Sequence, residues 1–132
     1  MEKLNESTPK KIVIVEDDPE ILNAINLFLG LDGYDVTVLS NGKAIMNNQV
    51  PLPDLYILDK MLPYANGTDI CHFLKINMET MFIPVIIISA TPCRDEAYDA
   101  GAIYFIEKPF SMHNFLNTVE DALKADSPKW VA

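Results

Sequence analysis

Charged and hydroxyl side chains stand at the ends of four short apolar runs in this sequence. They are Glu16, Asp17 and Asp18 after residues 12–15, Asp59 after residues 55–58, Ser89 after residues 85–88, and Lys108 after residues 103–106. Two carboxylates about 5 Å apart repel each other by about 3 kcal/mol at an effective dielectric constant of 20, so a cluster of three requires a cation. Hard oxygen ligands with open positions suit Mg²⁺. The lysine and the hydroxyl indicate an additional anionic guest, most simply a phosphoryl group, which a carboxylate can accept.

The elements that position these residues follow from hydrophobic periodicity. Short β-branched runs without alternation are typical of strands buried on both faces, and spacings of three and four predict amphipathic helices. Strands are expected over residues 12–15, 35–39, 55–58, 85–88 and 103–106. Helices are expected after an Asp18-Pro19 cap and over residues 43–48, 67–77 and 95–100, with a last one capped by Ser111. This alternation predicts βαβ units, and ligands of such sheets bind beyond the carboxyl ends of the strands.

Composition restricts the class of protein. The chain has 132 residues, 49% of them hydrophobic, and a net charge of −9, which is typical of one globular domain and disfavours binding to nucleic acid or to anionic membranes. The polar N-terminus has no apolar signal-peptide core, so a cytoplasmic protein is expected. Cys71 and Cys93 follow no paired spacing and are expected to be reduced thiols. The expected division is a disordered arm over residues 1–10, a domain over 11–125 and a tail or linker remnant over 126–132.

Taken in order, the motifs resemble those of a known family. They are KIVIVEDDP ending at Pro19, PDLYILDKMLP ending at Pro63 and followed by Gly67, IISA ending at Ala90, GA at residues 101–102 and KPF at residues 108–110. From about residue 11 to residue 124 the chain resembles a response-regulator receiver domain, the phosphorylatable module of two-component signal transduction. The resemblance implies an α/β fold: a doubly wound, five-stranded parallel sheet of order 2-1-3-4-5 between two layers of helices.

The resemblance also implies roles for the acidic residues. Asp59 would be the phosphoacceptor. Glu16 and Asp17 would hold Mg²⁺ together with Asp59 and the backbone carbonyl of Met61, with Mn²⁺ as the alternative cation. The side chains of Met61 and Thr91 would border the approach of water, and neither orients water well, so slow self-dephosphorylation is expected.

Three further residues would form the switch. By the same resemblance, Lys108 would pair with a phosphoryl oxygen, and the Lys108–Pro109 peptide bond would be cis. Ser89 would hydrogen-bond another phosphoryl oxygen and move toward it, while the ring of Phe105 turns inward. Tyr is common in the family at the position of Phe105, so any partner contact through that hydroxyl is missing here.

One region departs from the family pattern. Ser89 and Gly101 are 101 − 89 = 12 positions apart, about three fewer than in the family pattern and close to one helical turn. The family uses its fourth helix, fifth strand and fifth helix for output, so the effect of this shortening on dimerisation stays open.

The resulting hypothesis is a signalling switch rather than an enzyme, beyond promoting its own phosphorylation and slow dephosphorylation. The expected partners are a sensor histidine kinase, a phosphotransfer protein or a small phosphodonor, and a downstream output protein or a lost effector domain. A receiver fold that only binds protein, without regulation by phosphorylation, is the alternative. An aspartyl-phosphate phosphatase is disfavoured because Met61 stands where a second acid would be needed. A flavodoxin is disfavoured because Glu16, Asp17 and Asp18 would repel the flavin phosphate.

Overall fold

The computed structural model describes residues 8–124 of the chain. Five strands and five helices alternate: β1 (Lys11–Val15), α1 (Pro19–Leu31), β2 (Asp35–Leu39), α2 (Lys43–Met46), β3 (Leu55–Asp59), α3 (Gly67–Lys75), β4 (Val85–Ser89), α4 (Arg94–Asp99), β5 (Tyr104–Glu107) and α5 (Met112–Lys124). All neighbouring strands are parallel, and their order is β2-β1-β3-β4-β5. The predicted fold class and strand order are confirmed.

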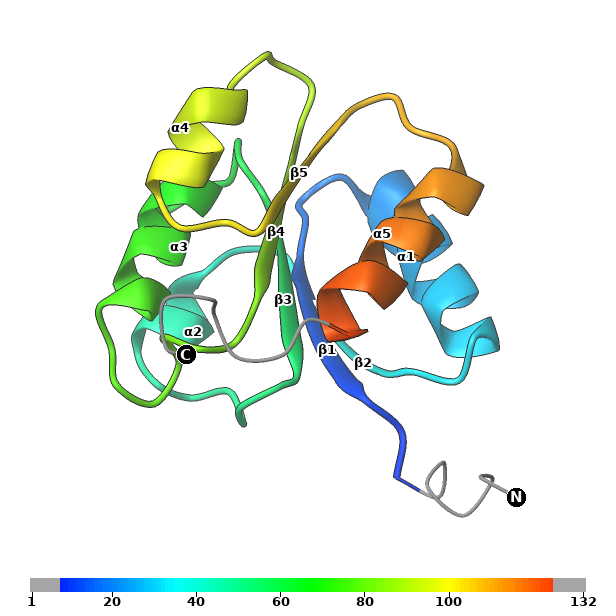
Figure 1. Cartoon of the computed structure of the whole chain (residues 1–132), viewed down its shortest axis with the longest axis horizontal. Helices are drawn as coiled ribbons and strands as arrows, with labels where there is room; N and C mark the ends of the chain where they lie inside the picture. The colour runs from blue at the N-terminus through cyan, green and yellow to red at the C-terminus, as the bar shows by residue number, and fades with distance from the viewer. Residues whose placement is uncertain (1–7, 125–132) are drawn as a thin grey trace.

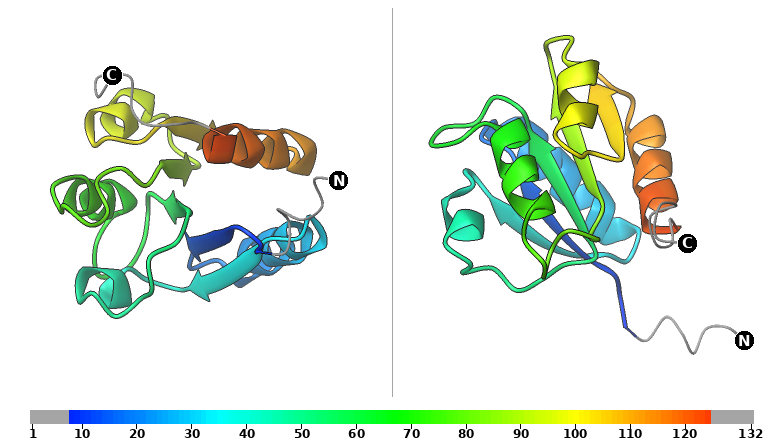
Figure 2. Two further views of the ribbon diagram at one scale, coloured as in Figure 1. Left: turned by 60° about the horizontal axis from the view of Figure 1, so that its bottom comes forward. Right: turned by 60° about the vertical axis from the view of Figure 1, so that its left-hand side comes forward.

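The sheet separates two layers of helices. Helices α2, α3 and α4 cover one face, and α1 and α5 cover the other (Figure 1). The turned views in Figure 2 show the same division. Each face has its own hydrophobic core, one containing Tyr56 and Leu58 and the other containing Ile57 and Phe115. Burial on both faces explains why the central strands read as unbroken apolar runs.

The strand register gathers the carboxyl ends of the central strands at one edge. Val15 pairs with Leu58, and Asp59 pairs with Ile88. The residues at the carboxyl ends of β1, β3 and β4 therefore lie side by side, as the sequence predicts.

The predicted caps are present. The Asp18 carboxylate accepts a hydrogen bond from the backbone N–H of Glu20 at 3.0 Å, with Pro19 at the start of α1. Ser111 Oγ accepts one from the N–H of Asn114 at 3.0 Å. Gly33, with φ +92°, follows the end of α1, whereas Gly30 lies inside the helix.

Several element bounds differ from those predicted. Helix α2 ends at Met46 rather than at residue 48, where Asn48 has a φ of 57°. Helix α3 ends at Lys75, whose ammonium turns back to donate to the carbonyls of Met81 and Ile83 at 3.1 and 2.7 Å. The fifth strand begins one residue later than predicted, at Tyr104.

Other expectations concern the termini and the cysteines. The proposed arm over residues 1–10 and the tail over 126–132 lie largely outside the described residues. Cys71 and Cys93 are buried free thiols. No helix within residues 8–124 combines the length and the apolar character that a membrane span requires.

Candidate functional site

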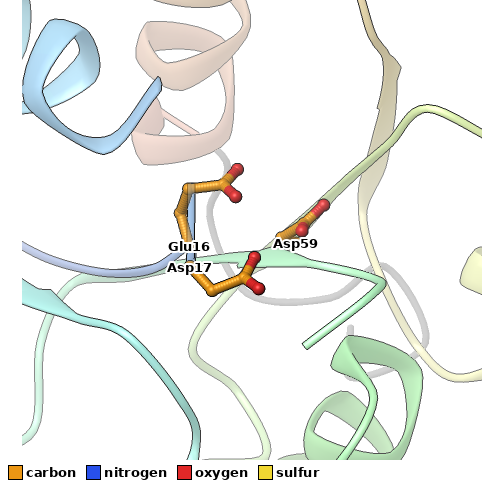
Figure 3. A group of neighbouring side chains, drawn as sticks. All are labelled: Glu16, Asp17 and Asp59. Carbon is orange, nitrogen blue, oxygen red and sulfur yellow. The ribbon is translucent and has the colours of Figure 1, made fainter. Parts of the chain in front are cut away.

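Three carboxylates meet at the carboxyl edge of the sheet. Glu16 and Asp17 directly follow β1, and Asp59 is the last residue of β3. One carboxylate oxygen from each lies within 4.8 Å of the others. Figure 3 shows the three side chains next to one another, with Glu16 and Asp17 on one segment and Asp59 on the neighbouring one. Glu16 and Asp59 are buried, whereas Asp17 is exposed, so the cluster opens toward solvent on one side.

The backbone around Asp59 is held by the start of α3. The N–H of Gly67 donates to the carbonyl of Lys60 at 2.9 Å. A Cβ at Gly67 would collide with the backbone carbonyl of Asp59, so only glycine allows α3 to begin this close to the strand end. The Asp59 side chain is therefore positioned by a close backbone approach.

Lys108 supplies the positive charge of the site. Its ammonium lies 2.9 Å from Glu16 Oε1 and 3.2 Å from Asp59 Oδ1, and its backbone N–H donates to the carbonyl of Ser89 at 2.8 Å. The peptide bond from Lys108 to Pro109 is cis, as predicted. One ammonium faces three carboxylates, so the ionised cluster keeps an excess of negative charge.

That imbalance changes the proton affinities of the site. Burial and the neighbouring charge of Glu16 raise the pKa of Asp59 to about 6, against the opposing attraction of Lys108. Burial lowers the pKa of Lys108, but the contacts and charges of Glu16 and Asp59 outweigh it, so the net shift is upward. The lysine thus stays charged, while Asp59 gives up its proton less readily than an ordinary aspartic acid.

The donor set fits a hard divalent cation. Glu16 Oε2 accepts a hydrogen bond from the N–H of Asp18 at 3.1 Å. Glu16 Oε1 is buried and, among the described residues, has the ion-pair contact with Lys108 but no aligned hydrogen bond. A buried carboxylate oxygen without an aligned donor, beside two more carboxylates, is suited to Mg²⁺ coordination. Glu16, Asp17 and Asp59 are the side chains that could hold it. The role predicted for the Met61 carbonyl stays a prediction, and the Met61 side chain is exposed.

Ser89 is buried at the end of β4, but its hydroxyl is engaged elsewhere. Ser89 Oγ lies 3.0 Å from Thr91 Oγ1 and accepts a hydrogen bond from the N–H of Thr91 at 3.1 Å. A phosphoryl group on Asp59 would have to draw the hydroxyl away from these partners. Its predicted role therefore implies a rotation, which stays a prediction.

The ring of Phe105 is already buried, whereas its predicted inward turn implies a ring that starts at the surface. The side chain is only 8% exposed and belongs to the core beneath α3 and α4. The guanidinium of Arg94 lies 5.4 Å from the ring centroid, within the range of a cation–π contact. The ring therefore has little surface left to bury, and its switch role stays a prediction.

The sequence reasoning missed an ion pair next to the site. Lys60 Nζ lies 3.3 Å from Glu96 Oε1 in α4. The two-residue period of a strand gives a partial signal, since Tyr56, Leu58 and Lys60 fall on one face. The strand period does not indicate which residue of α4 pairs with Lys60, which in the structure is Glu96.

An apolar groove of about 470 Å³ adjoins the lysine side of the site. It lies between α1 and the β5–α5 connection, and its lining includes Ile21, Ala24, Pro109, Phe110 and Met112 beside Lys108. A surface of this kind beside a charged cluster suits the approach of a protein rather than of a free anion alone.

A family model described as the response regulator receiver domain matches residues 12–120. The chain belongs to that family. It is thus a receiver domain of the response regulators of two-component systems, as its sequence motifs implied.

Individual relatives agree. The chain is 36% identical over 125 residues to the response regulator ArlR of Staphylococcus epidermidis, covering 89% of this chain and 54% of that protein. The non-phosphorylated HemR receiver domain from Leptospira biflexa is 28% identical with a TM-score of 0.79, covering 92% of this chain and 98% of that one. The receiver domain of the sensor histidine kinase PA1611 from Pseudomonas aeruginosa, solved with magnesium in its active-site cleft, shares the fold at 21% identity (TM-score 0.81; coverage 89% and 100%). This receiver domain spans about half the length of the curated relatives it matches.

Proposed function

We propose that this receiver domain is a phosphorylation-dependent signalling switch that accepts a phosphoryl group on Asp59. The observation that carries the proposal is the position of Asp59 between two acidic residues and Lys108. Asp59 Oδ1 lies 3.2 Å from the lysine ammonium, and its carboxylate shares one space with those of Glu16 and Asp17. This arrangement supplies an acceptor and charge partners for a transferring phosphoryl group.

The reaction is an in-line displacement at phosphorus. An Asp59 carboxylate oxygen forms a bond to the phosphorus, and the bond from phosphorus to the histidine nitrogen or the small-molecule oxygen of the donor breaks. The electron pair leaves with the donor atom. Most of what the protein contributes is position and electrostatic stabilisation.

Lys108 stabilises the phosphoryl oxygens. In the present structure its ammonium is shared between Glu16 and Asp59 at 2.9 and 3.2 Å. For the transfer, Lys108 would exchange its contact with Glu16 for a contact with an oxygen of the incoming phosphoryl group. Ser89, now bonded to Thr91, would turn to donate to a second phosphoryl oxygen.

The cation that we assign to Glu16, Asp17 and Asp59 is Mg²⁺, with Mn²⁺ as the alternative. When bound, it neutralises negative charge that spreads over the transferring oxygens. The support is the convergence of three carboxylates and the Glu16 oxygen that lacks an aligned donor. The backbone carbonyl of Met61 is assigned as a further ligand by family resemblance.

For the phosphodonor we propose a sensor histidine kinase or a phosphotransfer protein. The apolar groove lined by Ile21, Phe110 and Met112 adjoins Lys108, so a helical donor that packs there could present its histidine to Asp59. Because the curated relatives are about twice as long, we infer that the output passes to a downstream protein or an effector domain. We expect a receiver domain that is phosphorylated by such a kinase to act in the cytoplasm.

The experiment is incubation of the full chain with acetyl phosphate, with and without Mg²⁺, followed by intact mass measurement. Wild type should gain one phosphoryl mass only with Mg²⁺, and Asp59→Asn should gain none. Asp99→Asn, an exposed acid at the end of α4, is the matched control and should behave as wild type. Equal modification of wild type and Asp59→Asn would remove the proposed acceptor.

A further inference from the structure

The first turn of α4 is held by charged side chains rather than by a cap. Helix α4 has six residues, and no side chain caps its N-terminus. Glu96 Oε1 contacts Lys60 Nζ at 3.3 Å, and Glu96 Oε2 accepts a hydrogen bond from Thr68 Oγ1 at 3.5 Å. Arg94 covers the ring of Phe105. The residue after β3, helix α3 and strand β5 therefore all contact this single turn.

Lys60 directly follows Asp59, and its backbone is fixed on both sides. Its N–H donates to the carbonyl of Ile88 at 2.8 Å, and its carbonyl accepts from Gly67 at 2.9 Å. The side chains of Asp59 and Lys60 therefore start from backbone positions that are fixed relative to each other. The side chain of Lys60 is 17% exposed, so most of its stem is covered by the surrounding structure.

The two lysines near Asp59 divide their contacts. Lys108 pairs with Glu16 and Asp59 within the acidic cluster, whereas Lys60 pairs with Glu96 on the α4 side. Side chains of consecutive strand residues point to opposite faces, which explains why Lys60 leads away from the Asp59 carboxylate. Lys60 is thus placed to connect the phosphoacceptor loop with α4 rather than to bind the phosphoryl group.

The position of Phe105 limits what the ring itself can transmit. The ring is already buried and covered by Arg94, so an inward turn can carry little of a signal toward α4. The ion pair of Lys60 and Glu96, in contrast, directly connects the segment that follows Asp59 with α4.

We propose that the Lys60–Glu96 ion pair couples the phosphorylation state of Asp59 to the position of α4. The inference rests on the proposed function, namely that Asp59 accepts a phosphoryl group. That group brings roughly two negative charges within one residue of Lys60, where they compete with the single charge of Glu96. The balance of the pair then differs between the two states, and α4 follows it.

The test uses the full chain, in the unphosphorylated form and with acetyl phosphate and Mg²⁺. Two quantities are measured: the phosphoryl mass gained and the change in amide chemical shifts of residues 94–99. Glu96→Gln and Lys60→Met should keep phosphoryl incorporation within twofold of wild type but lose more than half of the α4 shift change. Glu120→Gln is the matched control, because it breaks the exposed Glu120–Lys124 pair of α5 and should leave both quantities unchanged.

A charge swap separates coupling from mere support of α4. The double variant Lys60→Glu with Glu96→Lys should restore the ion pair but not the lost shift change, because residue 60 then carries no ammonium for the phosphoryl charge to attract. Recovery of the full shift change in this variant would show that the pair only supports α4 and would overturn the coupling. A full α4 response in Glu96→Gln would overturn the coupling while leaving phosphorylation intact. If Lys60→Met does not fold, the half-exposed Glu96 position decides alone. Absence of phosphoryl mass on wild type would overturn the proposed function, and the coupling with it.

Discussion

The ammonium of Lys108 lies 2.9 Å from Glu16 Oε1, at the centre of the acidic edge of the sheet. The same ammonium is 3.2 Å from Asp59, the proposed acceptor. The lysine therefore compensates part of the charge of the cluster in the unphosphorylated chain. When a cation binds or a phosphoryl group arrives, the contacts of Lys108 with Glu16 and Asp59 have to change.

Mg²⁺ should stabilise the fold through the three carboxylates. A ligand present at ten times its dissociation constant stabilises by about 1.4 kcal/mol, which raises the melting temperature of a domain of this size by about 3–6 °C. We expect that increase for wild type in thermal melts at constant ionic strength. Asp17→Asn should show less than half of it, because Asp17 is the exposed, most accessible carboxylate of the cluster. Melting curves that do not respond to millimolar Mg²⁺ would count against the metal site.

The raised pKa of Asp59 predicts a pH-dependent cost to stability. Its pKa is about 6 in the folded chain against an ordinary value of 3.8, so between these values the folded state binds more protons than the unfolded state. The free energy of unfolding therefore falls as pH rises from about 4 through 6. Without metal at pH 8, Asp59→Asn should be more stable than wild type by about 1–3 kcal/mol. The difference should shrink as pH falls through 6 and vanish below about 4.

Urea denaturation at pH 8 and at pH 5, without metal, measures this difference. If Asp59→Asn is less stable than wild type at pH 8, the attraction of Lys108 stabilises the ionised Asp59 carboxylate by more than burial and repulsion from Glu16 destabilise it. That result would contradict the prediction.

Gly67→Ala should destabilise the chain by roughly 1–3 kcal/mol and reduce phosphorylation. The added Cβ collides with the backbone carbonyl of Asp59, so either α3 or the strand end must shift. Gly30→Ala is the matched control, because Gly30 lies in α1 with no atom near its missing Cβ. That substitution should stabilise by roughly 0.5–1 kcal/mol. Equal stabilities of the two variants in urea would show that the close approach to Asp59 is not required.

The sequence predicts the features of this site that follow from the order of strands and helices. It does not predict contacts that depend on how the helices pack. Glu16, Asp59 and Ser89 follow buried apolar runs, and parallel topology alone brings such positions to one edge. The predicted ends of α2 and α3 were too late. Helix α2 ends in a local turn at Asn48, which has a positive φ, and the N–H of Gln49 donates back to the carbonyl of Ala44. At the end of α3, Lys75 donates to carbonyls that lie beyond the helix, a contact that helical periodicity does not predict. The contact between Lys60 and Glu96 joins residues 36 positions apart in sequence, 96 − 60 = 36, and no periodicity encodes it.

The burial of Phe105 is another feature that the sequence could not predict. An aromatic residue in an edge strand is compatible with either an exposed or a buried ring. Here the core beneath α3 and α4 accepts the ring, and Arg94 covers it. Residue spacing does not specify the contact between Arg94 and the ring.

Met61→Asn should shorten the lifetime of the phosphorylated state. The Met61 thioether cannot donate a hydrogen bond to a water, whereas an amide can both donate and accept. One added hydrogen bond in the transition state, about 1.4 kcal/mol, corresponds to roughly tenfold faster hydrolysis. Decay of the phosphorylated chain in Mg²⁺ after removal of the donor gives the rate. Met78→Asn, an equally polar change at an exposed residue of the α3–β4 loop, should leave it unchanged. A fast wild-type decay, or no acceleration in Met61→Asn, would contradict the argument.

The most direct measurement is chemical mapping of the modified residue. The full chain is treated with acetyl phosphate and Mg²⁺, reduced with borohydride, which converts an aspartyl phosphate to homoserine, and digested for peptide sequencing by mass spectrometry. The account predicts conversion at residue 59 alone, dependent on Mg²⁺ and absent from Asp59→Asn. Conversion at Asp17 or at any other acid, with Asp59 unmodified, would contradict it.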